Sequence, residues 1–283
     1  MTPREAANLL ISCPDRPGIV AAVSRFLYEQ GANILEADQY ATQPQGGTFY
    51  MRMAFQFGVS SPADFERSFA AEVAAPLQMN WRVSQPDEPR RVAVLVSREE
   101  HCLLDLLWRA RRGDFEGEIV QVISNHPDHE PDVQAFGVPY AHVPIGDDQL
   151  EAEGEMAGLL AGKVELVVLA RYMRILSGEF LDRVGVPFIN IHHSFLPAFP
   201  GAEPYARAAE RGVKIIGATA HYVTTELDEG PIIEQDVERV SHRHSIDELA
   251  AIGRDIERTV LARAVRWHLQ DRVIVHENRT VVF

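Results

Sequence analysis

Three short runs of almost entirely apolar residues limit most strongly how this chain can fold. They are VAVLV at 92–96, LVVLA at 166–170 and FINI at 188–191, and patterns typical of helices lie between them, at 101–113, about 149–162 and around 178–184. Strands that are buried on both faces have continuous apolar sequences, and strands that alternate with helices form parallel sheets. We therefore predict an α/β domain with a mostly parallel, doubly wound sheet.

The first 85 residues have a different pattern. Strand candidates NLLISC, ILEADQYAT, TFYMRMAFQF and LQMNWRV are combined with two helix candidates, one after PDRPG and one at about 62–74. The resulting order of strand, helix, strand, strand, helix, strand is ferredoxin-like. Two prolines and several charged residues in VSQPDEPRR interrupt the periodic pattern. We therefore expect a small domain at 1–85, a linker at 86–92 and a larger domain at 93–283.

Composition and charge exclude several classes of function. The chain has 283 residues, 46% of them hydrophobic, with neither an apolar run of membrane-spanning length nor a signal-peptide pattern at its start, so we expect a cytoplasmic protein without a membrane partner. With 41 acidic and 27 basic residues the net charge is −14, which disfavours nucleic acid as a partner.

Neither cysteines nor histidines show the spacing of a metal site. Cys13 and Cys102 are too few and too far apart for a zinc site, so we expect buried, reduced thiols. The histidine pairs at 126 and 129, 192 and 193, and 242 and 244 have no third ligand at a suitable spacing. We therefore expect no metal and no cofactor.

A candidate site lies where the third apolar strand ends. Residues two apart on a strand share a face, so Asn190 and His192 should project into the same crevice at the carboxyl end of the sheet. The segment GATAHYVTTELDEGPII supplies His221 and, seven residues later, Asp228. An amide, an imidazole and a carboxylate are suited to attack on a carbonyl group: the amide binds the oxyanion, the imidazole stabilises charge, and the carboxylate orients or deprotonates the attacking group.

Three motifs in this region resemble those of the folate-dependent formyltransferases. INIHHSFLPAFPG is similar to their N-I-H-x-S-x-L-P-x-F-x-G signature, GATAHYVTTELDEGPII to their T-x-H-x-V-x-x-x-x-D-x-G-x-I-I segment, and LARYMRIL to the loop that wraps the pterin ring. The resemblance implies that Asn190 binds the formyl oxygen, His192 stabilises the tetrahedral intermediate and Asp228 activates water, with His221 supporting Asp228. It also implies folate-binding residues, which are Met173, Arg174, Ile175, Leu176, Thr224 and Leu227.

The N-terminal domain resembles an ACT domain. The residues that carry this resemblance are Asp15-Arg16-Pro17-Gly18 at the first turn and Gly31-Ala32-Asn33-Ile34 at the second strand. It implies a homo-oligomer and a regulatory amino-acid site at Pro17, Gly18 and Asn33, with glycine or methionine as the effector. A turn without any ligand explains the same residues, so both interpretations stay open.

Together the two domains make the whole chain similar to the formyltetrahydrofolate deformylases. This resemblance implies hydrolysis of the substrate 10-formyltetrahydrofolate to tetrahydrofolate and formate, which balances the one-carbon folate pool and supplies formate for purine synthesis. The alternatives are a formyltransferase that acts on an unphosphorylated amine and a catalytically silent folate or amino-acid sensor.

Further residues bear on the choice of acceptor and on binding of the folate tail. Glu99 and Glu100 follow the first apolar strand, where phosphate-binding relatives carry a glycine-containing loop, and their charge disfavours a phosphorylated acceptor. His193 should point away from His192, and either holds the loop or fills the space that an amine would occupy. Glu203 departs from the family pattern and would repel the folate glutamate tail if it faces it.

Overall fold

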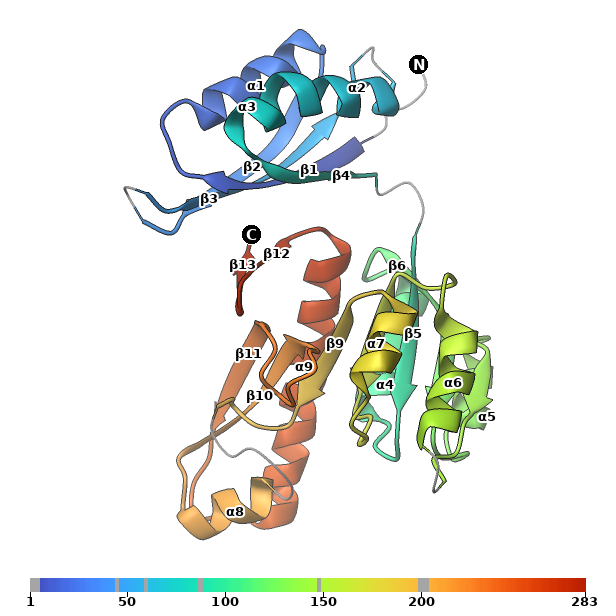
Figure 1. Cartoon of the computed structure of the whole chain (residues 1–283). Coiled ribbons are helices and arrows are strands. Elements are labelled where there is room, and N and C mark those ends of the chain that lie inside the picture. Colours follow the sequence, from blue (N-terminus) through green and yellow to red (C-terminus); the bar gives the residue numbers. More distant parts are fainter. Residues whose placement is uncertain (1–5, 44–45, 59–60, 86–88, 147–148, 198–203) are drawn as a thin grey trace. The chain divides into compact units, whose positions relative to one another are not determined.

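The structure is a computed structural model that describes residues 6–43, 46–58, 61–85, 89–146, 149–197 and 204–283. The chain forms two compact units, the first made of residues 1–89, 270–276 and 281–283 and the second of residues 90–269 and 277–280 (Figure 1). The sequence pattern did not suggest that C-terminal residues belong to the first unit. The expected boundaries at 85, 92 and 93 remain a prediction.

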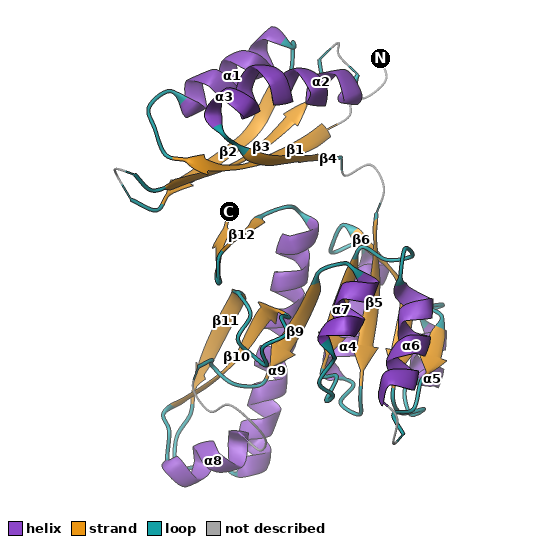
Figure 2. Ribbon diagram, viewed as in Figure 1, coloured by secondary structure: helices purple, strands orange, loops and turns teal. Residues whose placement is uncertain are grey.

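The first unit is an antiparallel sheet with helices on one face (Figure 2). Its elements are β1 (Ala6–Pro14), α1 (Ile19–Glu29), β2 (Asn33–Ala41), β3 (Thr48–Gln56), α2 (Pro62–Phe69), the π-helical turn η1 (Ala70–Ala74), α3 (Ala75–Leu77) and β4 (Asn80–Ser84). The strand order is β2-β3-β1-β4, so the expected ferredoxin-like arrangement is confirmed. Its core includes aromatic contacts in which the Phe26 ring lies 5.3 Å from Phe65 and 5.4 Å from Phe69, edge to face.

Polar contacts join the C-terminal segment to the sheet of this unit. This segment contains β12 (Val273–His276) and β13 (Arg279–Val282). The Asp271 side chain is 3% exposed and pairs with Arg82 on β4 at 2.7 Å, while Ser84 donates a hydrogen bond to the same carboxylate. Because a buried carboxylate is costly without such partners, these contacts fix the segment on the sheet.

The second unit is built on a seven-stranded sheet. Its strands are β5 (Arg90–Val96), β6 (Gly117–Ser124), β7 (Tyr140–His142), β8 (Leu166–Ala170), β9 (Phe188–His192), β10 (Ile215–Tyr222) and β11 (Ile232–Arg239), in the order β11-β10-β9-β8-β5-β6-β7. The strands from β9 to β7 in this order are parallel, and β10 pairs antiparallel with both β9 and β11. The prediction of a mostly parallel sheet is confirmed.

Helices cover both faces of this sheet (Figure 2). They are α4 (His101–Arg112), α5 (Glu130–Ala135), α6 (Gln149–Leu160), α7 (Gly178–Val184), α8 (Pro204–Arg211) and α9 (Ile246–Leu269). Helices α4 and α9 pack together, and so do α6 and α7. The expected helices correspond to α4, α6 and α7, whereas α5, α8 and α9 were not identified from the sequence. Among the helices in the described part of the chain, none combines the length and apolar character needed to cross a bilayer.

Candidate active site

The end of β9 and the turn between β10 and β11 bring the predicted amide, imidazole and carboxylate together. Asn190, His192 and Asp228 line one cavity of about 270 Å³ in the second unit. His192 Nδ1 lies 3.3 Å from Asp228 Oδ2, so the carboxylate holds one ring nitrogen of the imidazole. The arrangement that alternation along the strand predicted, with residues 190 and 192 in one crevice, is present.

The second ring nitrogen of His192 is available for chemistry. His192 Nε2 is buried and has no hydrogen-bond partner among the described residues. A buried polar atom without a partner is costly, and such atoms cluster at functional sites. Because Asp228 orients the ring through Nδ1, Nε2 is the atom that can act on a bound substrate.

Asn190 is oriented by His221. The two residues face each other across the β9–β10 pair, and Asn190 Nδ2 lies 3.2 Å from His221 Nε2. His221 Nδ1 donates to the Tyr222 carbonyl oxygen at 2.9 Å, and in the tautomer that this bond selects Nε2 accepts from the Asn190 amide. The second N–H of that amide is left for a substrate oxygen.

Asp228 is an ionised carboxylate in a strained turn. The hydrogen bond with His192 holds the pKa of the Asp228 carboxyl below its ordinary range, although burial acts in the opposite direction. Its φ of 58° lies in the left-handed region, which costs a residue other than glycine on the order of 1 kcal/mol. Strain of this kind persists where the surrounding structure holds the side chain in a required position.

Gly230 allows this turn to close, which yields a testable prediction. A Cβ at position 230 would lie 1.8 Å from the Tyr222 carbonyl oxygen. The Gly230→Ala variant should therefore displace Asp228, lower kcat at least tenfold and reduce the free energy of unfolding by about 1–3 kcal/mol. Steady-state kinetics and urea unfolding measure both effects. The control Gly158→Ala adds a methyl group to α6 in open space, so its kcat should not change. Equal behaviour of the two variants would contradict this role for Gly230.

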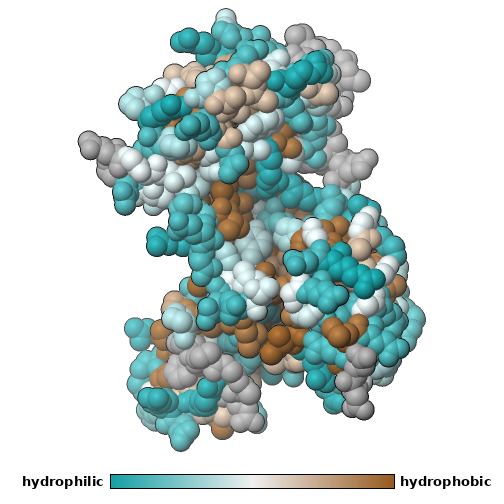
Figure 3. Space-filling model, viewed as in Figure 1, coloured by the Kyte–Doolittle hydropathy of each residue, from teal (hydrophilic) through white to brown (hydrophobic). Residues whose placement is uncertain are grey.

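Two loops, residues 173–176 and 224–227, form the walls of the cavity and carry exposed apolar side chains. Met173, Ile175 and Leu227 are 55%, 64% and 62% exposed, and all three line the cavity. Figure 3 shows hydrophobic surface on this face of the second unit, beside the position of α7. Apolar side chains held open at a cavity suit a flat ring system. The predicted folate-binding residues all line it: Met173, Arg174, Ile175, Leu176, Thr224 and Leu227.

Hydrogen bonds from the rest of the second unit hold the backbone of the first of these loops. Met173 N donates to Ser97 Oγ at 2.9 Å, Gln149 Nε2 donates to the Ile175 carbonyl oxygen at 2.7 Å, and Ser177 N donates to the buried Glu153 at 2.9 Å. The loop backbone is therefore positioned before any ligand arrives, which lowers the entropy cost of binding.

The other predicted positions fall outside this cavity. Gly18 is the N-cap of α1 with a φ of 95°, and Asn33 begins β2 on an exposed surface of the first unit. A regulatory site at Pro17, Gly18 and Asn33 remains a prediction. Glu203 lies outside the described residues.

The sequence led us to expect that His193 points away from the cavity, but the structure places it in the cavity lining. β9 ends at His192, so strand alternation does not extend to residue 193. The His193 ring lies 5.1 Å from the His192 ring and lines the same cavity. Burial, and then the charges of Arg171 and His192, lower the pKa of His193 to about 4, so this imidazole is neutral near pH 7.

The pKa of His193 predicts how stability depends on pH. Between pH 6.5, the ordinary value, and about 4, the unfolded chain binds a proton at His193 that the folded chain does not. The free energy of unfolding should therefore fall as pH decreases through this window, by about 2 kcal/mol from this residue at pH 5. In urea unfolding at pH 7 and pH 5, His193→Asn should lose about 2 kcal/mol less than the wild type. An equal loss in both proteins would contradict this assignment.

Sequence reasoning missed three residues that lie behind His193, which are His101, Tyr205 and Glu257. Glu257 on α9 is 1% exposed and accepts hydrogen bonds from His101 at 2.9 Å and from Tyr205 at 2.7 Å. Arg171 Nε lies 3.5 Å from the same carboxylate. The signal for Glu257 was its spacing: Leu249, Gly253, Glu257 and Leu261 follow one another at intervals of four on the buried face of α9.

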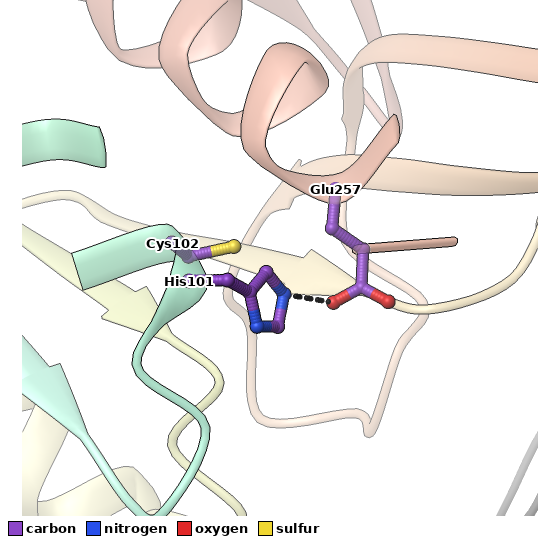
Figure 4. Close-up of side chains that lie close together, drawn as sticks. All are labelled: His101, Cys102 and Glu257. Carbon is purple, nitrogen blue, oxygen red and sulfur yellow. Dashed lines mark hydrogen bonds and ion pairs between the residues drawn. The ribbon is translucent and has the colours of Figure 1, made fainter. Parts of the chain in front are cut away.

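Part of this cluster also resembles a set of metal ligands. Donor atoms of His101, Cys102 and Glu257 lie within 4.8 Å of one another (Figure 4). However, the Glu257 oxygens are already occupied by His101 and Tyr205, and the Arg171 guanidinium repels a cation there. Burial raises the pKa of the Cys102 thiol well above its ordinary value, which disfavours the thiolate that a metal needs. The donor set therefore fits an ion-pair network better than a metal.

Comparison with known proteins adds the family context. Residues 90–265 match the family model described as "Formyl transferase", and residues 7–60 match "ACT domain". A protein named formyltetrahydrofolate deformylase from Mycobacterium bovis is 57% identical over 282 residues, 99% of this chain and 91% of the relative. Its namesake from Bacillus subtilis is 51% identical over 282 residues, covering 99% and 94%. A crystal structure of a formyltetrahydrofolate deformylase from Pseudomonas syringae has a TM-score of 0.94 at 46% identity, covering 100% of this chain and 96% of that one.

Proposed function

The chain belongs to the formyltetrahydrofolate deformylase family, and from this membership and the site we propose that it hydrolyses 10-formyltetrahydrofolate to tetrahydrofolate and formate. The observation that carries the proposal is the Asn190, His192 and Asp228 constellation in a cavity with exposed apolar walls. The relatives do not favour the alternative activities, transfer to an amine or silent sensing.

The loops give the substrate its orientation. The pterin ring lies against the apolar side chains of the 173–176 and 224–227 loops, and main-chain groups of these loops pair with its donors and acceptors. This placement directs the formyl group toward the end of β9, where the reactive side chains are.

Asn190 and His192 stabilise the oxyanion. The amide N–H that His221 leaves unused donates to the formyl oxygen, and the imidazolium form of His192, whose Nδ1–H faces Asp228, donates a second hydrogen bond from Nε2 as negative charge develops. Donors that are fixed before the reaction stabilise charge without reorganisation, and the loss of one such donor lowers kcat by about 10²–10³-fold.

Asp228 activates the water. Its carboxylate is ionised at neutral pH, so it accepts a proton from a water molecule as the water oxygen bonds to the formyl carbon. The bond between that carbon and N10 then breaks, and N10 takes up a proton. Formate and tetrahydrofolate leave, and no covalent enzyme intermediate is formed.

The test is formate release in buffer that contains no amine. Wild-type protein should release one formate for each tetrahydrofolate formed, as followed by a coupled formate assay and by absorbance. Tetrahydrofolate formation that requires an added amine would favour transfer over hydrolysis.

Further features of the family are part of the proposal. We propose a homo-oligomer, paired through its ACT domains, and an amino-acid effector, glycine or methionine, at that domain; the family match at residues 7–60 supports both. We place the reaction in the cytoplasm, where free buried thiols such as Cys13 and Cys102 stay reduced, and its formate would supply purine synthesis.

A further inference from the structure

A buried ion-pair network lies behind one wall of the cavity. Glu257 receives hydrogen bonds from His101 and Tyr205 and pairs with Arg171, so four elements, α4, α8, α9 and the end of β8, meet at one carboxylate. Burial opposes its charge, but the His101 hydrogen bond and the Arg171 guanidinium outweigh this effect and lower the pKa of Glu257. A buried carboxylate with three partners holds each of them in place.

Tyr205 is held both by close packing and by a hydrogen bond. Its ring fits against Gly253 on α9, where an added Cβ would lie 1.9 Å from the Tyr205 hydroxyl oxygen. The hydroxyl group donates to Glu257 at 2.7 Å. Gly253, which has no side chain, and the Glu257 carboxylate thus determine where the Tyr205 ring lies.

Tyr205 in turn confines His193. The centre of the His193 ring lies 6.3 Å from that of Tyr205 and 5.1 Å from that of His192. His193 is 8% exposed, and because its imidazole is neutral it packs there without a counter-ion. It therefore has little freedom to leave the space beside His192.

This confined side chain lines the reaction cavity itself. Among the residues that the structure describes, and apart from the two loops, the catalytic residues and His221, the polar residues with long side chains that line the cavity are Arg171, Tyr172 and His193. Tyr172 is 5% exposed and donates to the sulfur of Met156, and Arg171 is held by Glu257. In the described part of the chain, His193 is thus the cavity-lining side chain that packs beside the His192 ring, at 5.1 Å between ring centres.

We propose that His193, clamped between His192 and the Tyr205–Glu257 pair, is a specificity-determining residue that leaves room for water but not for an amine beside the formyl carbon. The inference rests on the proposed function. Tyr205 is a positioning residue in this scheme, since it acts through His193.

Loss of the His193 side chain, or of the Tyr205 contact that holds it, should allow transfer of the formyl group to an amine. With hydroxylamine as the probe, its nitrogen bonds to the formyl carbon and gives up one proton to Asp228, the bond from carbon to N10 breaks, and N10 takes up a proton. The products are formohydroxamic acid and tetrahydrofolate. The ratio of formohydroxamic acid to formate reports which acceptor is used, independently of overall rate.

The experiment compares this ratio in the wild type, His193→Ala, Tyr205→Phe and the control His242→Ala, an exposed histidine. The non-enzymatic reaction is subtracted, and the hydroxamate is measured as its coloured iron(III) complex. The ratio should rise at least tenfold in His193→Ala and several-fold in Tyr205→Phe, which only loses the hydrogen bond to Glu257. It should stay at the wild-type value in His242→Ala.

The outcomes separate this inference from the proposed function. Unchanged ratios in His193→Ala and Tyr205→Phe, with formate still released, would overturn the role of His193 and leave the hydrolase intact. If His193→Ala does not fold, the ratio in Tyr205→Phe decides. A wild type that releases no formate without amine would instead overturn the proposed function.

Discussion

Replacement of Asp228 by asparagine is expected to lower kcat by about 10²–10³-fold, equivalent to about 3–4 kcal/mol of transition-state stabilisation. An amide has nearly the same size as a carboxylate and can still hydrogen-bond to His192, but it cannot accept the proton from water. The substrate is held mainly by the two loops, so KM should change by less than about fivefold. Steady-state kinetics of tetrahydrofolate formation give both constants.

Glu229→Gln provides the matched control for this variant. Glu229 is the next residue in the same turn and is exposed, so the substitution makes the same chemical change without removing the proposed base. Its kcat should stay within about twofold of the wild-type value. An Asp228→Asn enzyme that retained a third of wild-type kcat would remove Asp228 from the chemistry.

His192→Ala is expected to have the other large effect, a loss of about 10³-fold in kcat. The variant loses the Nε2 donor to the oxyanion and the partner that holds Asp228 at 3.3 Å, so two contributions disappear together. The exposed His142→Ala is the control and should keep wild-type kcat. Added imidazole should restore part of the lost rate of His192→Ala, and activity near the wild-type value without imidazole would contradict the role.

The strands of the sheet and the two site residues on β9 could be predicted from the sequence because periodicity follows directly from local geometry. Apolar runs such as 166–170 identify strands covered on both faces, and the two-residue period of a strand places Asn190 and His192 on one side. The sequence offered Asp228 as the carboxylate partner of His192, but its catalytic role was implied by the resemblance, since no local rule states how a turn folds over a sheet.

The polar clusters could not be predicted from the sequence because their contacts join residues that are far apart along the chain. Whether Glu257 is solvated or buried depends on Arg171, His101 and Tyr205, which are remote in sequence and reach it through packing of α4, α8 and α9. Likewise, no pattern in the sequence indicates that β4 places Arg82 beside the buried Asp271. Propensity and spacing describe neighbours along the chain, and these polar clusters are set by tertiary structure.

The measurement that tests the central claim most directly is a single turnover of 10-formyltetrahydrofolate in ¹⁸O-labelled water without amine. If Asp228 activates water for attack on the formyl carbon, wild-type protein should give formate with one ¹⁸O atom per molecule, and Asp228→Asn should give almost none in the same time. Unlabelled formate, or no formate until an amine is added, would contradict hydrolysis by water at this site.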